Sequence, residues 1–192
     1  MSHPHLDLPD TFTTADAERL DLSRRQLARL QATGMVERVG RGLYRRVDAE
    51  PVDLDLLEIA VRAHRATLCL VSALAHHELT DVIPPVHDVA LPRGTWLPAV
   101  AAPVRWHRFD PATFDLGRTE IPTDDSHPIG LYDAPRSIVD AFRVRHIIGP
   151  EIATEALRRW LRRGGRPAHL LRTATAFPTA RPALLHTLQV LL

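Results

Sequence analysis

The chain has 192 residues, and 45% of them are hydrophobic, which favours one large or two small domains with a substantial core. The net charge is only +1, so any role in nucleic-acid binding depends on where the charges lie rather than on the chain as a whole. All 24 basic residues are arginine, and the absence of lysine excludes sites that need one, such as a P-loop, a kinase site or a nuclease site of carboxylates plus lysine.

Two short helices are predicted near the start of the chain. Thr13 or Thr14 caps the first helix, over 15–20, and a two-residue turn follows. Ser23 caps the second helix, and Gln26 lies three residues later, where a capping box requires it. This spacing predicts a helix-turn-helix.

A hairpin is predicted directly after the second helix. Gly34 is placed to end that helix in the left-handed conformation, and strands are expected over 35–39 and 43–46. Two glycines flank Arg41 at the tip, where positive φ angles are common. A helix-turn-helix followed by such a hairpin is typical of a winged helix.

The predicted winged helix is strongly basic. From Ser23 to Arg46 there are seven arginines and one acid, Glu37, so the local charge balance is +6. The first residues of the second helix of such motifs face the base edges of DNA, and arginine pairs with guanine and glutamine with adenine. Gln26 cannot fully serve both the cap and a base, so its role stays open. The alternative is an exposed basic helix and hairpin without a nucleic-acid partner.

The predicted interface assigns each residue one task. Four side chains of the second helix enter the major groove, the hairpin tip reaches the backbone or the minor groove, and the last strand meets phosphates. In that order the predicted DNA-binding residues are Ser23 as the cap, then Arg24, Arg25, Gln26 and Arg29, then Arg41, and then Arg45 and Arg46.

The domain boundaries follow from prolines and acids. Only residues 1–12 precede the motif, and they include Pro4 and Pro9, so the usual first helix of a winged helix is expected to be missing, reduced or replaced by an extended segment. The acids that begin at Asp48 indicate the end of this N-terminal domain, over 1–48, and residues 52–192 form a second domain.

Strands come first and helices later in the second domain, which predicts an α+β fold that ends in a helical segment. The one capping serine expected in this domain is Ser72, and Asp133 caps a later helix. The expected helices are 54–64, 73–79, 134–143, 150–163, 167–176 and 182–191, and the expected strands are 67–71, 86–91, 104–109 and 129–132.

A second basic cluster lies in the helix expected over 150–163. Its predicted partner-binding residues are Arg158, Arg159, Arg162 and Arg163, and Arg166 follows shortly after the helix. One interpretation is a surface for nucleic acid or for an acidic partner protein. The other is a solvated helix face, with Glu155 placed four residues before Arg159 as a stabilising ion pair.

Catalytic chemistry is not indicated. The eleven histidines lack the spacing of a metal site, although His87, His107 and His127 would converge if their strands paired. Asp124 and Asp125 are adjacent in a loop, where carboxylates are usually solvated. No nucleophile elbow accompanies the serines. We therefore expect no catalytic residue, no metal and no cofactor.

Cys69 is the only cysteine and lies in an apolar run, so it is expected to be a buried thiol without a disulfide partner. This fits a reducing cytoplasm. The sequence shows no signal peptide and no apolar run of about eighteen residues, so we expect neither secretion nor membrane insertion.

The order of motifs is similar to that of the AbiEi-type antitoxin family of type IV toxin–antitoxin and abortive-infection systems. The matching segments are 12–17, 22–24, 39–44, 72–79, 91–94, 132–140 and 155–164. The resemblance implies a winged helix that represses its own operon by binding operator DNA, a C-terminal domain needed for antitoxicity, and a cognate nucleotidyltransferase-like toxin as partner. The alternative is an interaction module that neutralises a toxin by direct contact and no longer binds DNA.

Overall fold

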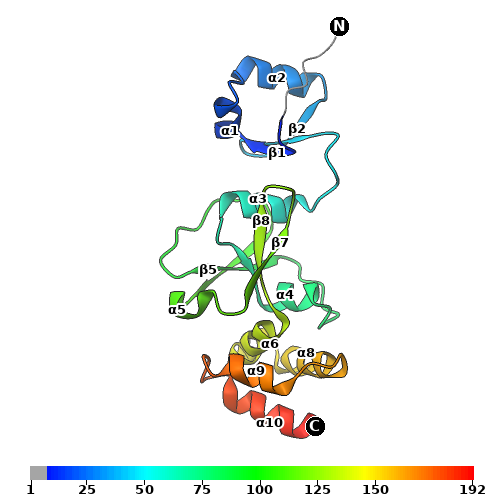
Figure 1. Ribbon diagram of the computed structural model, residues 1–192, viewed down its shortest axis with the longest axis vertical. Helices are drawn as coiled ribbons and strands as arrows, with labels where there is room; N and C mark the ends of the chain where they lie inside the picture. Colours follow the sequence, from blue (N-terminus) through cyan, green and yellow to red (C-terminus); the bar gives the residue numbers. More distant parts are fainter. Residues whose placement is uncertain (1–7) are drawn as a thin grey trace. The chain divides into compact units, whose positions relative to one another are not determined.

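The computed structural model describes residues 8–192 and confirms the predicted α+β class. The described residues form two compact units (Figure 1). The N-terminal unit contains residues 8–64 together with the short segments 99–102 and 122–128. The C-terminal unit contains 65–98, 103–121 and 129–192.

The N-terminal unit has two short helices, a three-stranded antiparallel sheet of order β1-β3-β2, and a third helix. A winged helix usually has a helix before the motif. In the described part of that segment, the chain is instead extended and forms the first strand. The elements are β1 (Thr11–Thr13), α1 (Thr14–Arg19), α2 (Arg24–Ala32), β2 (Val36–Gly40), β3 (Leu43–Arg46) and α3 (Leu54–Arg62).

Both helix starts are fixed by local hydrogen bonds that the sequence predicts. Thr13 caps α1, and its partner in a capping box is Asp16. Ser23 caps α2, and its partner is Gln26. The hydrogen bonds from Thr13 lower the pKa of the Asp16 carboxyl. Each box satisfies amides that a helix start otherwise leaves without a partner.

Two different layers cover the two faces of this sheet. Phe12 and Tyr44 pair across β1 and β3, their rings stack with centroids 5.8 Å apart, and they pack with Leu27 of α2. Side chains alternate along a strand, so Leu43 and Arg45 lie on the opposite face. That face is also covered, because both Leu43 and Arg45 are buried.

Asp124 is buried against that second face, which corrects the expectation of a solvated loop carboxylate. Its side chain is 2% exposed, and Arg45 Nη1 lies 3.9 Å from its Oδ2. Burial raises the pKa of the Asp124 carboxyl, but hydrogen bonds from Ser126, Thr11 and His127 outweigh burial, so the pKa is lowered overall. Its neighbour Asp125 is exposed, as expected.

The helix α3 belongs to the N-terminal unit. Its buried Glu58 accepts hydrogen bonds from the backbone amides of Ala101 and Ala102, each 2.9 Å long. The predicted domain boundary at residues 48–52 stays a prediction. Helix α3 and the segment 99–102 both follow that boundary in the sequence, yet they belong to the same unit as the residues before it.

The C-terminal unit is built on a mixed five-stranded sheet of order β6-β5-β4-β8-β7. The pairs β5–β6 and β4–β8 are parallel, and β4–β5 is antiparallel. Its strands are β4 (Thr67–Leu68), β5 (His87–Pro92), β6 (Val104–Phe109), β7 (Arg118–Pro122) and β8 (Pro128–Tyr132).

Helices form the second layer of this unit, and α6 lies at their centre. It contacts α4, α8, α9 and α10 (Figure 1). Asp133 caps it, with a proline in the first turn, as the sequence predicts. The helices of the unit are α4 (Leu70–His76), α5 (Pro111–Phe114), α6 (Ala134–Arg143), α7 (Arg145–Ile148), α8 (Pro150–Arg162), α9 (Pro167–Ala174) and α10 (Arg181–Leu191).

One predicted cap was wrong. The strand expected over 67–71 ends at Leu68, because Leu70 has a φ of +45° that an extended strand does not allow. The helix α4 starts at Leu70 with Cys69 at its N-cap, and Ser72 lies inside it. The Ser72 hydroxyl instead accepts a hydrogen bond from the Asp88 amide, at 2.8 Å.

A fully buried arginine joins the two layers of the C-terminal unit. Arg136 Nε donates to Asp140 Oδ2 at 2.9 Å, and Nη1 donates to the carbonyls of Thr113 and Leu116 at 2.7 and 2.6 Å. Its guanidinium carbon lies 4.2 Å from the centroid of the Tyr132 ring. Because these partners come from α5, β8 and α6, one side chain holds three elements together.

We expect Asp140→Ala to destabilise the protein by about 3–5 kcal/mol, because removal of one partner leaves a buried charge without compensation. Urea unfolding monitored by circular dichroism measures the effect. The matched control is Asp115→Ala, which removes the exposed Arg65–Asp115 pair and should cost less than about 1 kcal/mol. Equal losses for the two variants would contradict a structural role for the buried pair.

The Asp124 carboxylate makes the stability of the protein decrease at acid pH. Its pKa is lowered by folding, so its contribution is present at neutral pH and is lost as pH falls below about 4 toward the folded-state pKa. We expect Asp124→Asn to lower the thermal midpoint at pH 7 and to flatten its fall at acid pH. Asp125→Asn, at the exposed neighbour, should change neither, and a matching drop there would argue against burial as the cause.

Candidate nucleic-acid interface

The helix α2 presents three arginines to solvent. Arg24, Arg25 and Arg29 are all exposed, and among residues 8–192 none of them has an ion pair or a side-chain hydrogen bond. The opposite face of the helix is fixed in the core by the buried Leu27 and the partly buried Leu30. The helix α2 therefore has a core face and a basic face.

Gln26 acts as a cap in this structure. The side-chain Oε1 of Gln26 accepts hydrogen bonds from Ser23 N and Ser23 Oγ at 2.8 and 2.7 Å. The backbone amide of Gln26 donates to Ser23 Oγ at 3.3 Å. A bidentate contact with adenine needs both the oxygen and the nitrogen of the side-chain amide. Because the oxygen is already occupied, Gln26 orients the start of α2.

The hairpin tip carries one exposed arginine. Gly34 ends the α2 segment with a φ of +68°, as predicted, and Gly42 has a φ of +62° at the tip, whereas Gly40 does not need a positive φ. A Cβ on Gly42 would lie 2.9 Å from Thr14 Oγ1, so the tip packs closely on the start of α1. Arg41 is exposed between the two glycines of the tip.

Both arginines of β3 are hydrogen-bonded to groups of the same chain. Arg45 is 3% exposed, and its guanidinium donates to Thr11 Oγ1 at 2.7 Å and to the carbonyl of Glu50. Arg46 is partly buried and donates to both oxygens of Asp48. The burial of Arg45 argues against its predicted contact with a phosphate.

Arg38 is an exposed arginine that was not among the predicted DNA-binding residues. It lies on β2, and its Nε donates to the carbonyl of Gly40 at 3.0 Å. It adds a positive charge to the same hairpin as Arg41. The sequence shows that Arg38 lies in the basic segment from Ser23 to Arg46. The strand pattern alone does not show which arginine of that segment is exposed.

Most of the second basic cluster is neutralised within the chain. Arg158 and Arg159 bind Glu155 at 2.7 and 2.8 Å, and Arg159 also binds Asp81 through its terminal nitrogens Nη1 and Nη2. Hydrogen bonds from Arg159 lower the pKa of the Asp81 carboxyl and of the Glu155 carboxyl.

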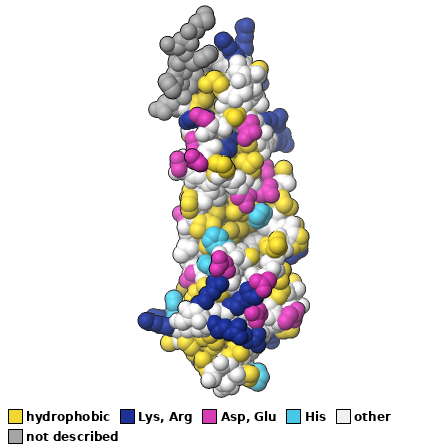
Figure 2. Space-filling model, turned by 90° about the vertical axis from the view of Figure 1, so that its right-hand side faces the viewer, with side chains coloured by type: hydrophobic (Ala, Val, Ile, Leu, Met, Phe, Trp, Pro, Cys, Tyr) yellow, Lys and Arg dark blue, Asp and Glu magenta, His cyan; other side chains and the backbone are white. Residues whose placement is uncertain are grey.

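Arg163 is the third member of the cluster with an acidic partner, Glu78, at 3.2 Å. Figure 2 shows dark blue arginine side chains next to magenta acidic ones on the face in view. Arg162 is exposed, and within the described residues its guanidinium has no partner. The predicted Glu155–Arg159 pair is present.

Two of the histidines pair with carboxylates. His107 Nε2 lies 2.8 Å from Asp88 Oδ1, and His127 Nδ1 lies 3.0 Å from Asp124 Oδ1. Cys69 is buried, which raises the pKa of its thiol.

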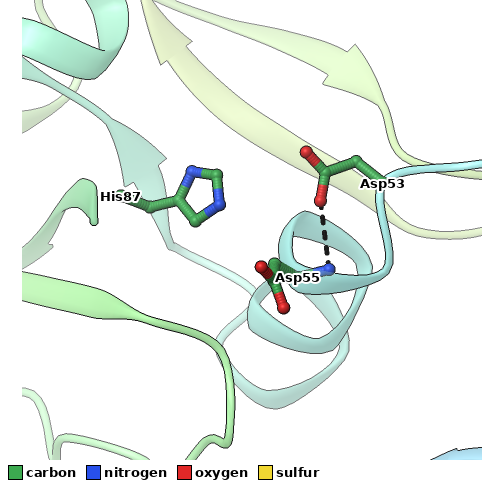
Figure 3. Close-up of side chains that lie close together, drawn as sticks. All are labelled: Asp53, Asp55 and His87. Atoms are coloured by element: carbon green, nitrogen blue, oxygen red, sulfur yellow. Dashed lines mark hydrogen bonds between the residues drawn. The ribbon is translucent and has the colours of Figure 1, made fainter. Parts of the chain in front are cut away.

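Figure 3 draws a further group of side chains, Asp53, Asp55 and His87. The dashed line marks the Asp55 amide, which donates to Asp53 Oδ1 at 3.0 Å and thereby caps α3. The two carboxylates belong to the N-terminal unit and His87 belongs to the C-terminal unit. Because these residues are divided between two units, we assign no metal site to them.

Comparison with known proteins adds a family and a fold. Residues 5–47 match the model of a family described as "Transcriptional regulator, AbiEi antitoxin". No curated protein sequence matches the chain. The crystal structure of the RV2827C protein from Mycobacterium tuberculosis is similar, with a TM-score of 0.54 and 19% identity, covering 94% of this chain and 77% of that one. This likeness shows a shared fold.

In the part of the chain that the structure describes, no helix has the length and apolar character that crossing a membrane requires. The family match covers both helices of the basic motif and its hairpin, which are the segments that carry the exposed arginines. Over residues 5–47 the chain is therefore similar to the AbiEi antitoxin family of transcriptional regulators, in agreement with the resemblance drawn from the sequence.

Proposed function

We propose that the protein is an antitoxin-type repressor whose N-terminal unit is a winged helix-turn-helix that binds operator DNA. The element order β1-α1-α2-β2-β3 supports this, because it places a helix-turn-helix before a two-stranded wing. The family match over the same residues supports a role in transcriptional regulation. In the described chain, strand β1 occupies the position before α1.

The observation that carries the proposal is the contrast between two sets of arginines. Arg24, Arg25 and Arg29 on α2 have no acidic partner in the described chain, whereas Arg158, Arg159 and Arg163 each have one. Exposed cations that the protein leaves unneutralised are available to a polyanion, and phosphate neutralisation dominates the affinity of DNA-binding proteins.

The proposed roles follow the position of each residue. Arg24 and Arg25 lie in the first turn of α2, the part of a recognition helix that contacts base edges, and Arg29 lies one turn later. Arg41 at the tip and Arg38 on β2 contact the backbone or the minor groove. Ser23 and Gln26 hold the start of the helix, and Arg45 and Arg46 stabilise the hairpin rather than bind phosphates.

The partner implied by the resemblance is a nucleotidyltransferase-like toxin, which this protein counteracts. In the alternative function, the protein neutralises the toxin by direct contact and does not bind DNA. Arg162 is the member of the second basic cluster best suited to such a contact, because it is exposed and no described residue neutralises it.

We expect Arg24→Ala and Arg25→Ala to weaken binding to the chain's own operator and to relax base preference, because a bidentate contact between arginine and guanine contributes about 1–3 kcal/mol. Titration of operator and random duplexes at several salt concentrations measures both effects. Arg38→Ala is the matched control on the hairpin, and it should weaken both duplexes alike because backbone contacts carry little sequence information. Equal losses on both duplexes for Arg24 and Arg25 would refute base reading.

The alternative function predicts a different result for Arg162→Glu. If α8 contacts the toxin, this substitution should abolish the protection of cells that express the toxin, while operator binding and helix content stay unchanged. Arg172→Glu on α9 is the control, since Arg172 is also exposed. Surface substitutions of this kind usually change stability by less than about 0.5 kcal/mol. Full protection by Arg162→Glu would place the toxin contact elsewhere.

A further inference from the structure

A pocket in the N-terminal unit lies beside the hairpin tip. It has a volume of about 510 Å³, which falls within the usual size range of small-molecule sites. Residues from the start of α1, the tip, the end of α3 and the segment 99–102 surround it. The lining residues are Thr13, Thr14, Ala15, Arg41, Gly42, Arg62 and Ala99.

The pocket is positively charged. Two of its lining residues are arginines and none is acidic. Glu58, one turn before Arg62 on α3, is engaged by the amides of Ala101 and Ala102. In the described part of the chain, neither Arg41 nor Arg62 has an ion pair with a carboxylate.

Arg62 has an unused donor. Its Nη2 donates to the carbonyl of Arg41, which fixes the guanidinium against the hairpin tip. Its Nε is buried and has no hydrogen-bond partner among the described residues. A buried N–H group without a partner is costly, so an arrangement that retains one needs a physical explanation. Arg62 lines the pocket, so a turn of its guanidinium toward a bound acceptor would supply the missing partner.

We propose that this pocket binds a phosphate group through Arg41 and Arg62. A guanidinium presents several N–H donors in a planar fork, which matches the oxygens of a phosphate. Arg62 is pre-oriented by its bond to the tip, and Arg41 is exposed and able to close over the anion. The phosphate comes either from the backbone of bound DNA, in which case this inference rests on the proposed function, or from a small phosphorylated molecule.

The first arm of the test uses inorganic phosphate without DNA. The ¹⁵N–¹H resonance of Arg62 Nε should shift on titration with phosphate, and calorimetry should show binding that weakens at least about tenfold in Arg41→Gln and Arg62→Gln. Arg172→Gln, which removes an exposed charge from the C-terminal unit, should bind as the native protein does.

A pair of substitutions at Ala99 controls for folding, because it leaves both arginines in place. Ala99→Glu should block phosphate binding by placing a carboxylate in the pocket, whereas Ala99→Gln has nearly the same size and should bind phosphate. Thermal melting verifies that each variant is folded. Loss in Ala99→Glu but not in Ala99→Gln supports an anion site even if Arg62→Gln proves unstable.

The second arm identifies the source of the phosphate. If it is the DNA backbone, Ala99→Glu and Arg41→Gln should weaken operator and random duplexes alike, and Arg41→Gln should reduce the salt slope by about one. If DNA binding is unchanged while phosphate binding is lost, the ligand is a small phosphorylated molecule. No phosphate binding at millimolar concentration together with unchanged DNA affinity would overturn the proposal. Because the first arm needs no DNA, a failure of the proposed function is distinguishable from a failure of this inference.

Discussion

The C-terminal unit depends on one buried cation, the guanidinium of Arg136. Its side chain is fully buried on α6, the helix that contacts most of the other helices of the unit. The carbonyls of Thr113 and Leu116, the carboxylate of Asp140 and the Tyr132 ring surround it. Burial of a charge is costly without compensation, so these partners have to be in place together. That requirement ties the short helix α5 to the sheet and to α6.

Arginine has two opposite uses in this protein. Arg45, Arg136 and Arg159 are bound by carboxylates or carbonyls of the same chain and serve to join elements. Arg24, Arg25 and Arg29 have no such partner in the described residues and give α2 a basic face. A planar guanidinium forms several hydrogen bonds in fixed directions, which suits it to both tasks. Local charge counts do not separate the two uses, because Arg45 lies in the same basic segment as Arg24, Arg25 and Arg29.

The N-terminal unit requires segments that are remote in sequence. Asp124 faces Arg45 from 79 positions away, and Ala101 and Ala102 bind the Glu58 carboxylate on α3. Both contacts compensate charged groups in partly or fully buried positions. The hairpin therefore has a second covered face, which a free-standing motif of residues 1–48 would expose to water. This physical link makes the stability of the proposed DNA-binding motif sensitive to the loop at 122–128.

The features that could be predicted from the sequence are those that depend on neighbouring residues. The caps at Thr13, Ser23 and Asp133, the turn at Gly34 and the α+β order follow from interactions within four or five positions, so periodicity and residue type were sufficient. The short elements β1, α5, β7 and α7 have too few residues for a recognisable period.

The exposure of each arginine depends on contacts between residues that are far apart in the sequence. The strand pattern places Arg45 on the same face as Leu43, but its burial depends on Asp124, and the charge of α8 depends on Asp81 and Glu78. The pocket beside Arg62 likewise arises where α3 meets the hairpin tip. Contacts between residues tens of positions apart leave no periodic signal in a single sequence, so exposure and charge compensation were settled only when the chain folded.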